Sequence, residues 1–181
     1  MNINKLFSTK EREKILRYVL IKRKSFRVTT VAKSLNISKG LVSQFLDYLY
    51  KLNVLKKQGS LYSVNFDFGL TKAIKILLNV SLIDVRIFKK IPNILGVGLY
   101  GSWAKGTNDV TSDVDIWIKL KKPVNEKYIA EIEQKLRERT MHDVSILSLY
   151  PEKLKRIKKE EVELYNSLFY NSIVLWGEGI D

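Results

Sequence analysis

The chain contains no cysteine and only one histidine, and these absences exclude several kinds of site. Disulfides and thiolate zinc sites need cysteine, so neither can form, and the lack of cysteine is typical of a reducing compartment. His142 stands alone, which excludes a histidine metal cluster. No apolar run approaches the ~18 residues of a membrane span, and the first residues carry no long apolar stretch. The sequence therefore predicts a cytoplasmic protein that does not enter a membrane.

Positive charge dominates, and it is unevenly distributed. The 181 residues include 32 Lys and Arg against 19 Asp and Glu, a net charge of +13. The chain through Lys90 has 19 basic and 5 acidic residues, whereas the chain from Ile91 has 13 basic and 14 acidic residues. Such asymmetry predicts two modules, of which only the first is suited to meet a polyanion.

A glycine-containing turn follows the apolar run 94–100, which is typical of a buried strand. Gly101 and Ser102 open the segment Gly-Ser-Trp-Ala-Lys-Gly. Glycine allows the backbone to approach a ligand closely, and a helix start can present N–H groups to an anion. This turn is a candidate phosphate cradle.

Two aspartates alternate with aliphatic residues just after the turn. Side chains of a strand alternate between its faces, so Asp113 and Asp115 are expected to project together while Val114 and Ile116 enter the core. Neighbouring carboxylates repel unless a cation lies between them, and a hard divalent ion is the natural partner. The alternative is an ordinary solvated strand face.

These motifs resemble the nucleotidyltransferases related to DNA polymerase beta, and among them the minimal nucleotidyltransferases. The family pattern of Gly-Ser, about ten residues and Asp-x-Asp stands here as residues 101–106 and 112–115. The resemblance covers roughly the second half of the chain. It implies nucleotide phosphate binding by Gly101, Ser102, Lys105 and Ser112, and Mg²⁺ or Mn²⁺ binding by the aspartates. Lys105 replaces the usual arginine, so it keeps the charge but loses the bidentate fork.

The resemblance also implies a third carboxylate on a later strand, for which Asp143 is the candidate. A helix is predicted for 126–140, capped by Asn125, and a strand begins near Asp143. Strand–helix–strand order would return Asp143 beside the aspartate strand. Asp113, Asp115 and Asp143 are thus the expected metal ligands and catalytic residues, and Asp143 could accept the proton of an attacking hydroxyl. An ordinary strand-start aspartate is the alternative.

The implied reaction is metal-dependent transfer of a nucleoside monophosphate from a nucleoside triphosphate, with ATP favoured, to an unknown hydroxyl of a protein or nucleic acid. A regulator with an inactive or ligand-sensing domain remains an alternative from another class. The resemblance adds a third possibility, since some minimal nucleotidyltransferases are antitoxins that modify a small helical HEPN partner.

The first module has the element order of a winged helix-turn-helix, which it resembles from Ser8 to Phe66. Ser8 and Glu11 predict a capping box, Thr29 or Thr30 begins a second helix, and Ser38 caps a third. Strands are expected at 53–57 and 61–66 around a turn at 58–60. The resemblance implies DNA contacts by residues of the third helix and the wing: Ser38, Lys39, Ser43, Gln44, Lys56 and Lys57. A module that binds protein is the alternative.

The expected architecture is α/β (α+β): a winged helix-turn-helix in 1–68, a rigid connecting helix in 69–90, and a nucleotidyltransferase domain in 91–181 with a small mixed sheet flanked by helices. A helix from Pro151, a helix over 160–171 and a strand over 172–176 complete the chain. Trp103 could stack on a base or pack in the core, and Trp117 could line the cleft.

Overall fold

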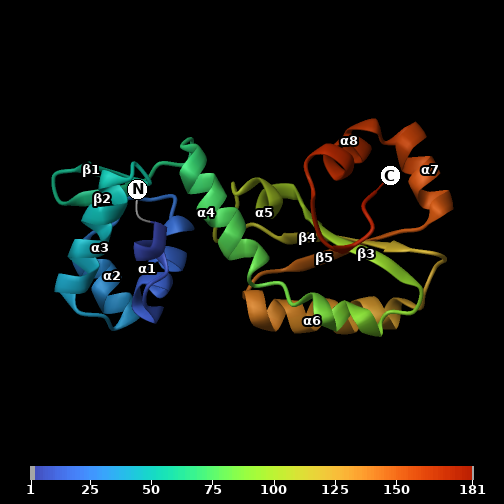
Figure 1. Cartoon of the computed structure of the whole chain (residues 1–181), viewed down its shortest axis with the longest axis horizontal. Helices are drawn as coiled ribbons and strands as arrows, with labels where there is room; N and C mark the ends of the chain where they lie inside the picture. The colour runs from blue at the N-terminus through green and yellow to red at the C-terminus, as the bar shows by residue number, and fades with distance from the viewer. Residues whose placement is uncertain (1–2, 181) are drawn as a thin grey trace. The chain divides into compact units, whose positions relative to one another are not determined.

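The computed structural model describes residues 3–180, and the chain divides into two compact units between Lys75 and Ile76 (Figure 1). The division falls inside the segment 69–90 that the sequence assigns to a connecting helix. Each unit is described separately.

The first unit contains three helices and a hairpin after a short 3-10 turn. Its elements are η1 (Ile3–Leu6), α1 (Lys10–Leu20), α2 (Val28–Leu35), α3 (Lys39–Lys51), β1 (Leu55–Gln58) and β2 (Leu61–Val64). The cap of α3 is Ser38, as predicted, since its side chain accepts a hydrogen bond from the Leu41 N–H. The predicted capping box at Ser8 is wrong, because Thr9 caps α1 by accepting from the Arg12 N–H.

The hairpin is antiparallel, with Lys57 opposite Tyr62, and Gly59 turns it in the left-handed region. A third strand segment joins it at Phe26, whose N–H and C=O both bond to Tyr62 at 2.8 and 2.9 Å. The order of elements is the one expected of a winged helix-turn-helix, and that classification stays a prediction.

The predicted helix over 69–90 is wrong as a single element. Helix α4 (Gly69–Val80) ends, and a separate 3-10 helix, η2 (Val85–Lys90), begins after a break. Asp84 causes the restart, because its carboxylate accepts from the Arg86 N–H and thereby caps η2.

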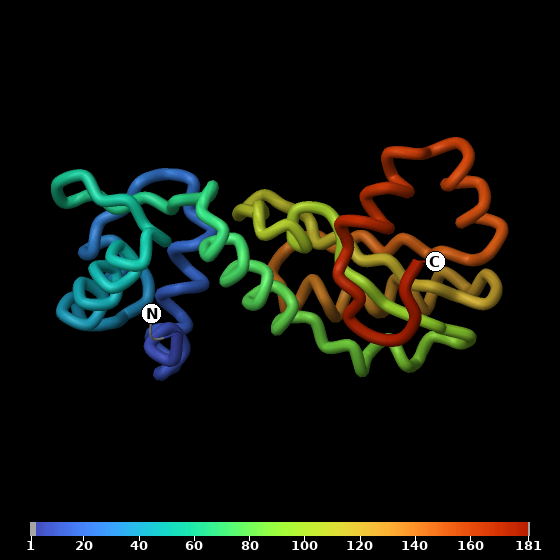
Figure 2. Tube along the Cα trace, turned by 45° about the horizontal axis from the view of Figure 1, so that its top comes forward, coloured from blue at the N-terminus to red at the C-terminus, as the bar shows by residue number. Residues whose placement is uncertain are grey.

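The second unit is built on a four-stranded mixed sheet with the order β5-β4-β3-β6. Its strands are β3 (Ile94–Tyr100), β4 (Val114–Leu120), β5 (Val144–Leu149) and β6 (Ile173–Gly177), and its helices are α5 (Gly101–Lys105), α6 (Glu126–Thr140), α7 (Pro151–Glu160) and α8 (Val162–Tyr170). Strand β3 runs antiparallel to β4 and β6, whereas β4 and β5 are parallel. Strand β6 is an edge strand paired with β3, and Figure 2 traces this last part of the chain in red. The small mixed sheet flanked by helices is confirmed.

Alternation along β4 divides its side chains between two cores. Val114, Ile116 and Ile118 pack with Leu136 of α6, while Trp117 packs on the other face with residues of α7 and α8. Figure 1 shows α6 along one face and α7 and α8 over the other.

Trp117 is a core residue, so its expected place in a cleft is wrong. Its indole lies over Gly98, the opposite residue of β3, and a Cβ at Gly98 would overlap the ring. Within residues 3–180, no helix is both long and apolar enough to cross a bilayer.

Candidate functional site

The turn after β3 places its backbone directly against a carboxylate. Gly101 has φ +66°, a conformation that favours glycine, and begins the five-residue helix α5. The N-cap residue, Tyr100, makes no side-chain capping bond to this helix. A Cβ at Gly101 would overlap Oδ2 of Asp115, so the motif's turn and its second aspartate are in contact.

The two aspartates differ in exposure. Asp113 is exposed just before β4, whereas Asp115 lies half-buried in β4 opposite Tyr100. Burial raises the pKa of Asp115, and the charge of Asp113 raises it further. Burial, with the charge of Asp115, also raises the pKa of Tyr100 to about 12. Negative charge is therefore concentrated beside the Gly101 turn.

A buried aspartate, Asp109, orders the loop that carries Asp113. Its Oδ1 accepts from the Thr111 N–H at 2.9 Å, from the Thr111 hydroxyl at 2.8 Å and from the Ser112 hydroxyl at 3.2 Å. Ser112 Oγ in turn accepts from the Asp109 N–H at 2.9 Å. The Ser112 hydroxyl thus holds the loop, and its predicted contact with phosphate stays a prediction.

A second buried group, Asn79 at the end of α4, joins both parts of the motif. Its amide donates to Trp103 O at 2.9 Å and to Asn108 Oδ1 at 3.0 Å. Asn79 and Asn108 are both buried. The sequence analysis missed Asn79, Asn108 and Asp109. The only local sign in the sequence that Asn79 is buried was its position between the apolar residues Leu78 and Val80.

Trp103 belongs to the core, because it is only 2% exposed and packs with the aliphatic residues of β3 and β4. Its ring meets the His142 ring edge-on, with centroids 5.2 Å apart. Nδ1 of His142 lies 2.9 Å from Ser112 O, so His142 also contacts the loop before β4. The core interpretation of Trp103 is confirmed, and a base-stacking position is not available to it.

Asp143 lies beside the start of β4, as the strand–helix–strand order predicts, but it is not gathered with the other two acids. Its backbone oxygen accepts from the Val114 N–H, while its side chain is 86% exposed and lies 3.9 Å from Nε of Arg137. Among residues 3–180, no group of three or more His, Cys, Asp or Glu side chains is placed to hold a metal.

The pair Asp113 and Asp115 nevertheless fits a divalent cation that nucleotide phosphates would share. Mg²⁺ is commonly held by one or two carboxylates, with water and phosphate oxygens completing its shell. Burial and the neighbouring charge of Asp113 raise the pKa of Asp115, and a bound cation would offset both effects by stabilising the ionised carboxylate.

The remaining predicted residues are mostly accessible. Lys105 is exposed at the end of α5, and Ser102 is half-exposed at its start. In the first unit, Ser38, Lys39, Gln44 and Lys56 are exposed, and Ser43 is half-buried. Lys57 is already engaged, since its Nζ lies 2.7 Å from Oδ1 of Asp47.

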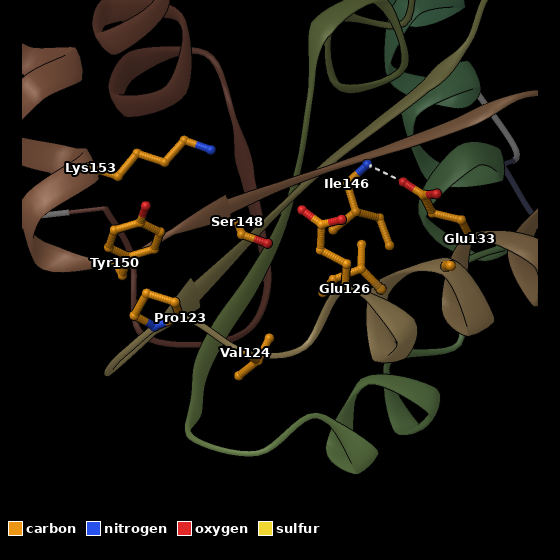
Figure 3. Close-up of a pocket in the computed structure, with 10 residues that line it drawn as sticks. Pro123, Val124, Glu126, Glu133, Ile146, Ser148, Tyr150 and Lys153 are labelled. Carbon is orange, nitrogen blue, oxygen red and sulfur yellow. Dashed lines mark hydrogen bonds between the residues drawn. The ribbon is translucent and has the colours of Figure 1, made fainter.

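A cavity of about 480 Å³ lies between β5, α6 and α7, on the opposite face of the sheet from Asp115 (Figure 3). Ile146 and Ser148 line it, and these residues alternate with the β5 residues that share the Asp115 face. Glu133 closes part of the strand edge by accepting from the Ile146 N–H at 3.0 Å. The cavity contains none of the predicted site residues, so the geometry of the motif marks the candidate site better than cavity size does.

Comparison with known proteins finds a family match in the second unit. Residues 85–172 match the family model described as polymerase beta, nucleotidyltransferase. All the motif residues and the four carboxylates Asp109, Asp113, Asp115 and Asp143 lie within the matched segment. Residues 85–172 of the second unit therefore match a nucleotidyltransferase domain of the polymerase beta kind.

The individual proteins to which the chain is similar match only part of it. An uncharacterized protein from Methanocaldococcus jannaschii is 34% identical over 92 residues, which are 48% of this chain and 51% of that protein, so the match spans about half of its length. The structure of a toxin–antitoxin with AMP-PNP is 22% identical, covering 61% of this chain and 75% of that one, with a TM-score of 0.40. A tri-AMPylated HEPN toxin in complex with an MNT antitoxin, from Shewanella oneidensis, shows 19% identity, covers 59% and 73%, and has a TM-score of 0.36.

Proposed function

We propose that the second unit binds a nucleoside triphosphate together with Mg²⁺ or Mn²⁺ and transfers its nucleoside monophosphate to a hydroxyl. The hydroxyl oxygen bonds to the α-phosphorus, the bond from the α-phosphorus to the bridging oxygen breaks, and pyrophosphate leaves. The observation that carries this proposal is the contact between the Gly101 turn and the carboxylate of Asp115, with Asp113 beside it. The turn and the carboxylates offer the two complementary surfaces that a metal–nucleotide complex requires, one for phosphate oxygens and one for a cation.

Each residue has a distinct role in this proposal. Backbone N–H groups at Gly101 and Ser102 hold phosphate oxygens, and the exposed ammonium of Lys105 adds positive charge nearby. Asp113 and Asp115 hold the cation, and Ser112 keeps the loop of Asp113 ordered through Asp109. The bound cation would neutralise charge that develops on the phosphates during transfer. Asp143 is retained as a candidate proton acceptor from the sequence.

Label transfer tests the reaction. The protein is incubated with α-³²P-ATP and Mn²⁺, alone, with duplex DNA, or with a HEPN-type helical protein. A labelled polymer that disappears in Asp115→Asn, while Lys153→Ala in the distant cavity still yields it, supports transfer and identifies the acceptor class. If no polymer is labelled in any arm, at an ATP concentration that saturates the protein, the result would contradict transferase activity with these acceptors.

We further propose that the first unit binds DNA. Its support is the net charge of +12 over residues 1–75, from 16 basic and 4 acidic residues, and the accessibility of Ser38, Lys39 and Gln44 at and along α3. Phosphate would meet Ser38 and Lys39 at the helix start, Gln44 would reach a base edge, and Ser43 and Lys56 would contribute less directly. To contact a phosphate, the Lys57 ammonium has to break its ion pair with Asp47 or bind both groups at once.

A regulator that senses nucleotide without transferring it is the second candidate. The observation that favours it is the separation of Asp143 from the other two aspartates, which leaves two carboxylates at the turn. This candidate predicts nucleotide binding without label transfer, and DNA binding whose affinity changes when ATP and Mn²⁺ are added.

A further inference from the structure

The register of the sheet identifies a side chain at the nucleotide site that the motif did not indicate. Asp115 of β4 is opposite Tyr100 on β3 and in register with Ser145 on β5. Residues in register on neighbouring strands project to the same face, and adjacent strands lie about 4.8 Å apart. Tyr100, Asp115 and Ser145 therefore form one row across the sheet.

Packing around the row confirms the face on which it lies. Two positions further along β4 and β5, and on the same face, Trp117 and Leu147 are also in register. Both pack in the core beneath α7 and α8. The neighbours of Ser145 on β5, Val144 and Ile146, pack instead against the core on the α6 face. Ser145 is thus fixed on the Asp115 face, and it is exposed there.

Asp143 precedes the strand by one residue, and its side chain is turned toward solvent and Arg137. Because β5 begins at Val144, the first β5 residue on the Asp115 face is Ser145. The β5 side chain directly beside Asp115 is therefore the hydroxyl of Ser145, whereas the backbone of Asp143 lies one step earlier, beside the start of β4.

We infer that Ser145 is a binding residue of the nucleotide site and forms its third corner beside Asp113 and Asp115. This inference rests on the proposed function. The serine hydroxyl donates a hydrogen bond to a phosphate oxygen or accepts one from a cation-bound water, and it adds no negative charge. Because this hydroxyl carries no charge, Ser145 contributes more to the binding of nucleotide with its cation than to the binding of a free cation.

Two substitutions on β5 test the assignment with a matched control. Ser145→Asp places a third carboxylate about 5 Å from Asp115, and Coulomb attraction at that distance in water predicts Mn²⁺ binding tighter by about tenfold. Ser148→Asp adds the same charge to the same strand on the opposite face, and it should leave Mn²⁺ affinity within about twofold. Ser145→Ala should weaken binding of ATP with Mn²⁺ by roughly three- to tenfold. Electron paramagnetic resonance measures free Mn²⁺, and circular dichroism confirms folding.

The outcomes separate this inference from the proposed function. Equal Mn²⁺ affinities in Ser145→Asp and Ser148→Asp would overturn the assignment of Ser145, as would a loss of Mn²⁺ binding in Asp143→Asn with none in the Ser145 variants. If the wild type binds neither Mn²⁺ nor ATP, the proposed function fails. In that case, new Mn²⁺ binding in Ser145→Asp still supports the placement of Ser145 beside Asp115, and its absence overturns it.

Discussion

Replacing Gly101 by alanine should damage the second unit through both backbone and side-chain effects. Gly101 has φ +66°, and an L-residue in the left-handed region costs about 1–2 kcal/mol. The new Cβ would also overlap Oδ2 of Asp115, and overpacking of this kind adds about 1–3 kcal/mol. The free energy of unfolding should therefore fall by about 2–5 kcal/mol. The Asp115 carboxylate has to move to make room.

Gly59→Ala provides a control that separates the two effects. Gly59 has φ +58° in the β1–β2 turn, but nothing lies within 4 Å of a Cβ built on it. Its substitution should cost only the backbone contribution of about 1–2 kcal/mol. It should leave the nucleotide site unchanged.

Urea unfolding supplies the assay. Tryptophan fluorescence reports the second unit, since Trp103, Trp117 and Trp176 all lie there, and circular dichroism follows both units. ATP affinity in the presence of Mn²⁺ should fall at least tenfold in Gly101→Ala. A destabilisation no larger than that of Gly59→Ala, together with unchanged ATP affinity, would refute the contact between Gly101 and Asp115.

Three further perturbations test other parts of the structure. Asp113→Asn removes the like charge that helps to raise the pKa of Asp115. A carboxyl whose pKa is higher in the folded than in the unfolded protein lowers the free energy of unfolding as pH rises between these two pKa values. Asp113→Asn should therefore make this decrease smaller, as measured by urea unfolding at a series of acidic pH values. Asn79→Leu should cost about 1–3 kcal/mol in fluorescence-detected unfolding, because it removes three buried hydrogen bonds, and a neutral result would contradict their contribution. Lys39→Ala should reduce the slope of log DNA affinity against log salt by about 0.9 in a polarisation assay if Lys39 contacts a phosphate, whereas an unchanged slope would remove it from the interface.

Local patterns in the sequence predicted much of the fold. The alternation from Val114 to Ile118 indicated a strand with two faces, and Asn125 and Ser38 cap the helices that they were expected to cap. These features depend on neighbouring residues only, since a cap or an alternation is a local property of the chain. The break between α4 and η2 was missed because Asp84 acts as a cap inside an otherwise helical pattern.

The site was less predictable, because it depends on contacts between distant segments. The motif located Gly101, Asp113 and Asp115, whose geometry follows from a strand and a turn. The proposal of Ser145 required the register of β4 against β5, which spacing alone does not give. Asn79 acts across 24 residues to reach Trp103 O, and no local pattern specifies such a partner.

Calorimetric titration of ATP into the protein with Mn²⁺, for the wild type and for Asp115→Asn, tests the proposed nucleotide site most directly. The arrangement of Gly101, Asp113 and Asp115 predicts saturable binding of one nucleotide by the wild type and a loss of at least tenfold in the variant, which keeps the shape of the side chain but removes its charge. Equal affinity in the two proteins would contradict a metal–nucleotide site at these carboxylates.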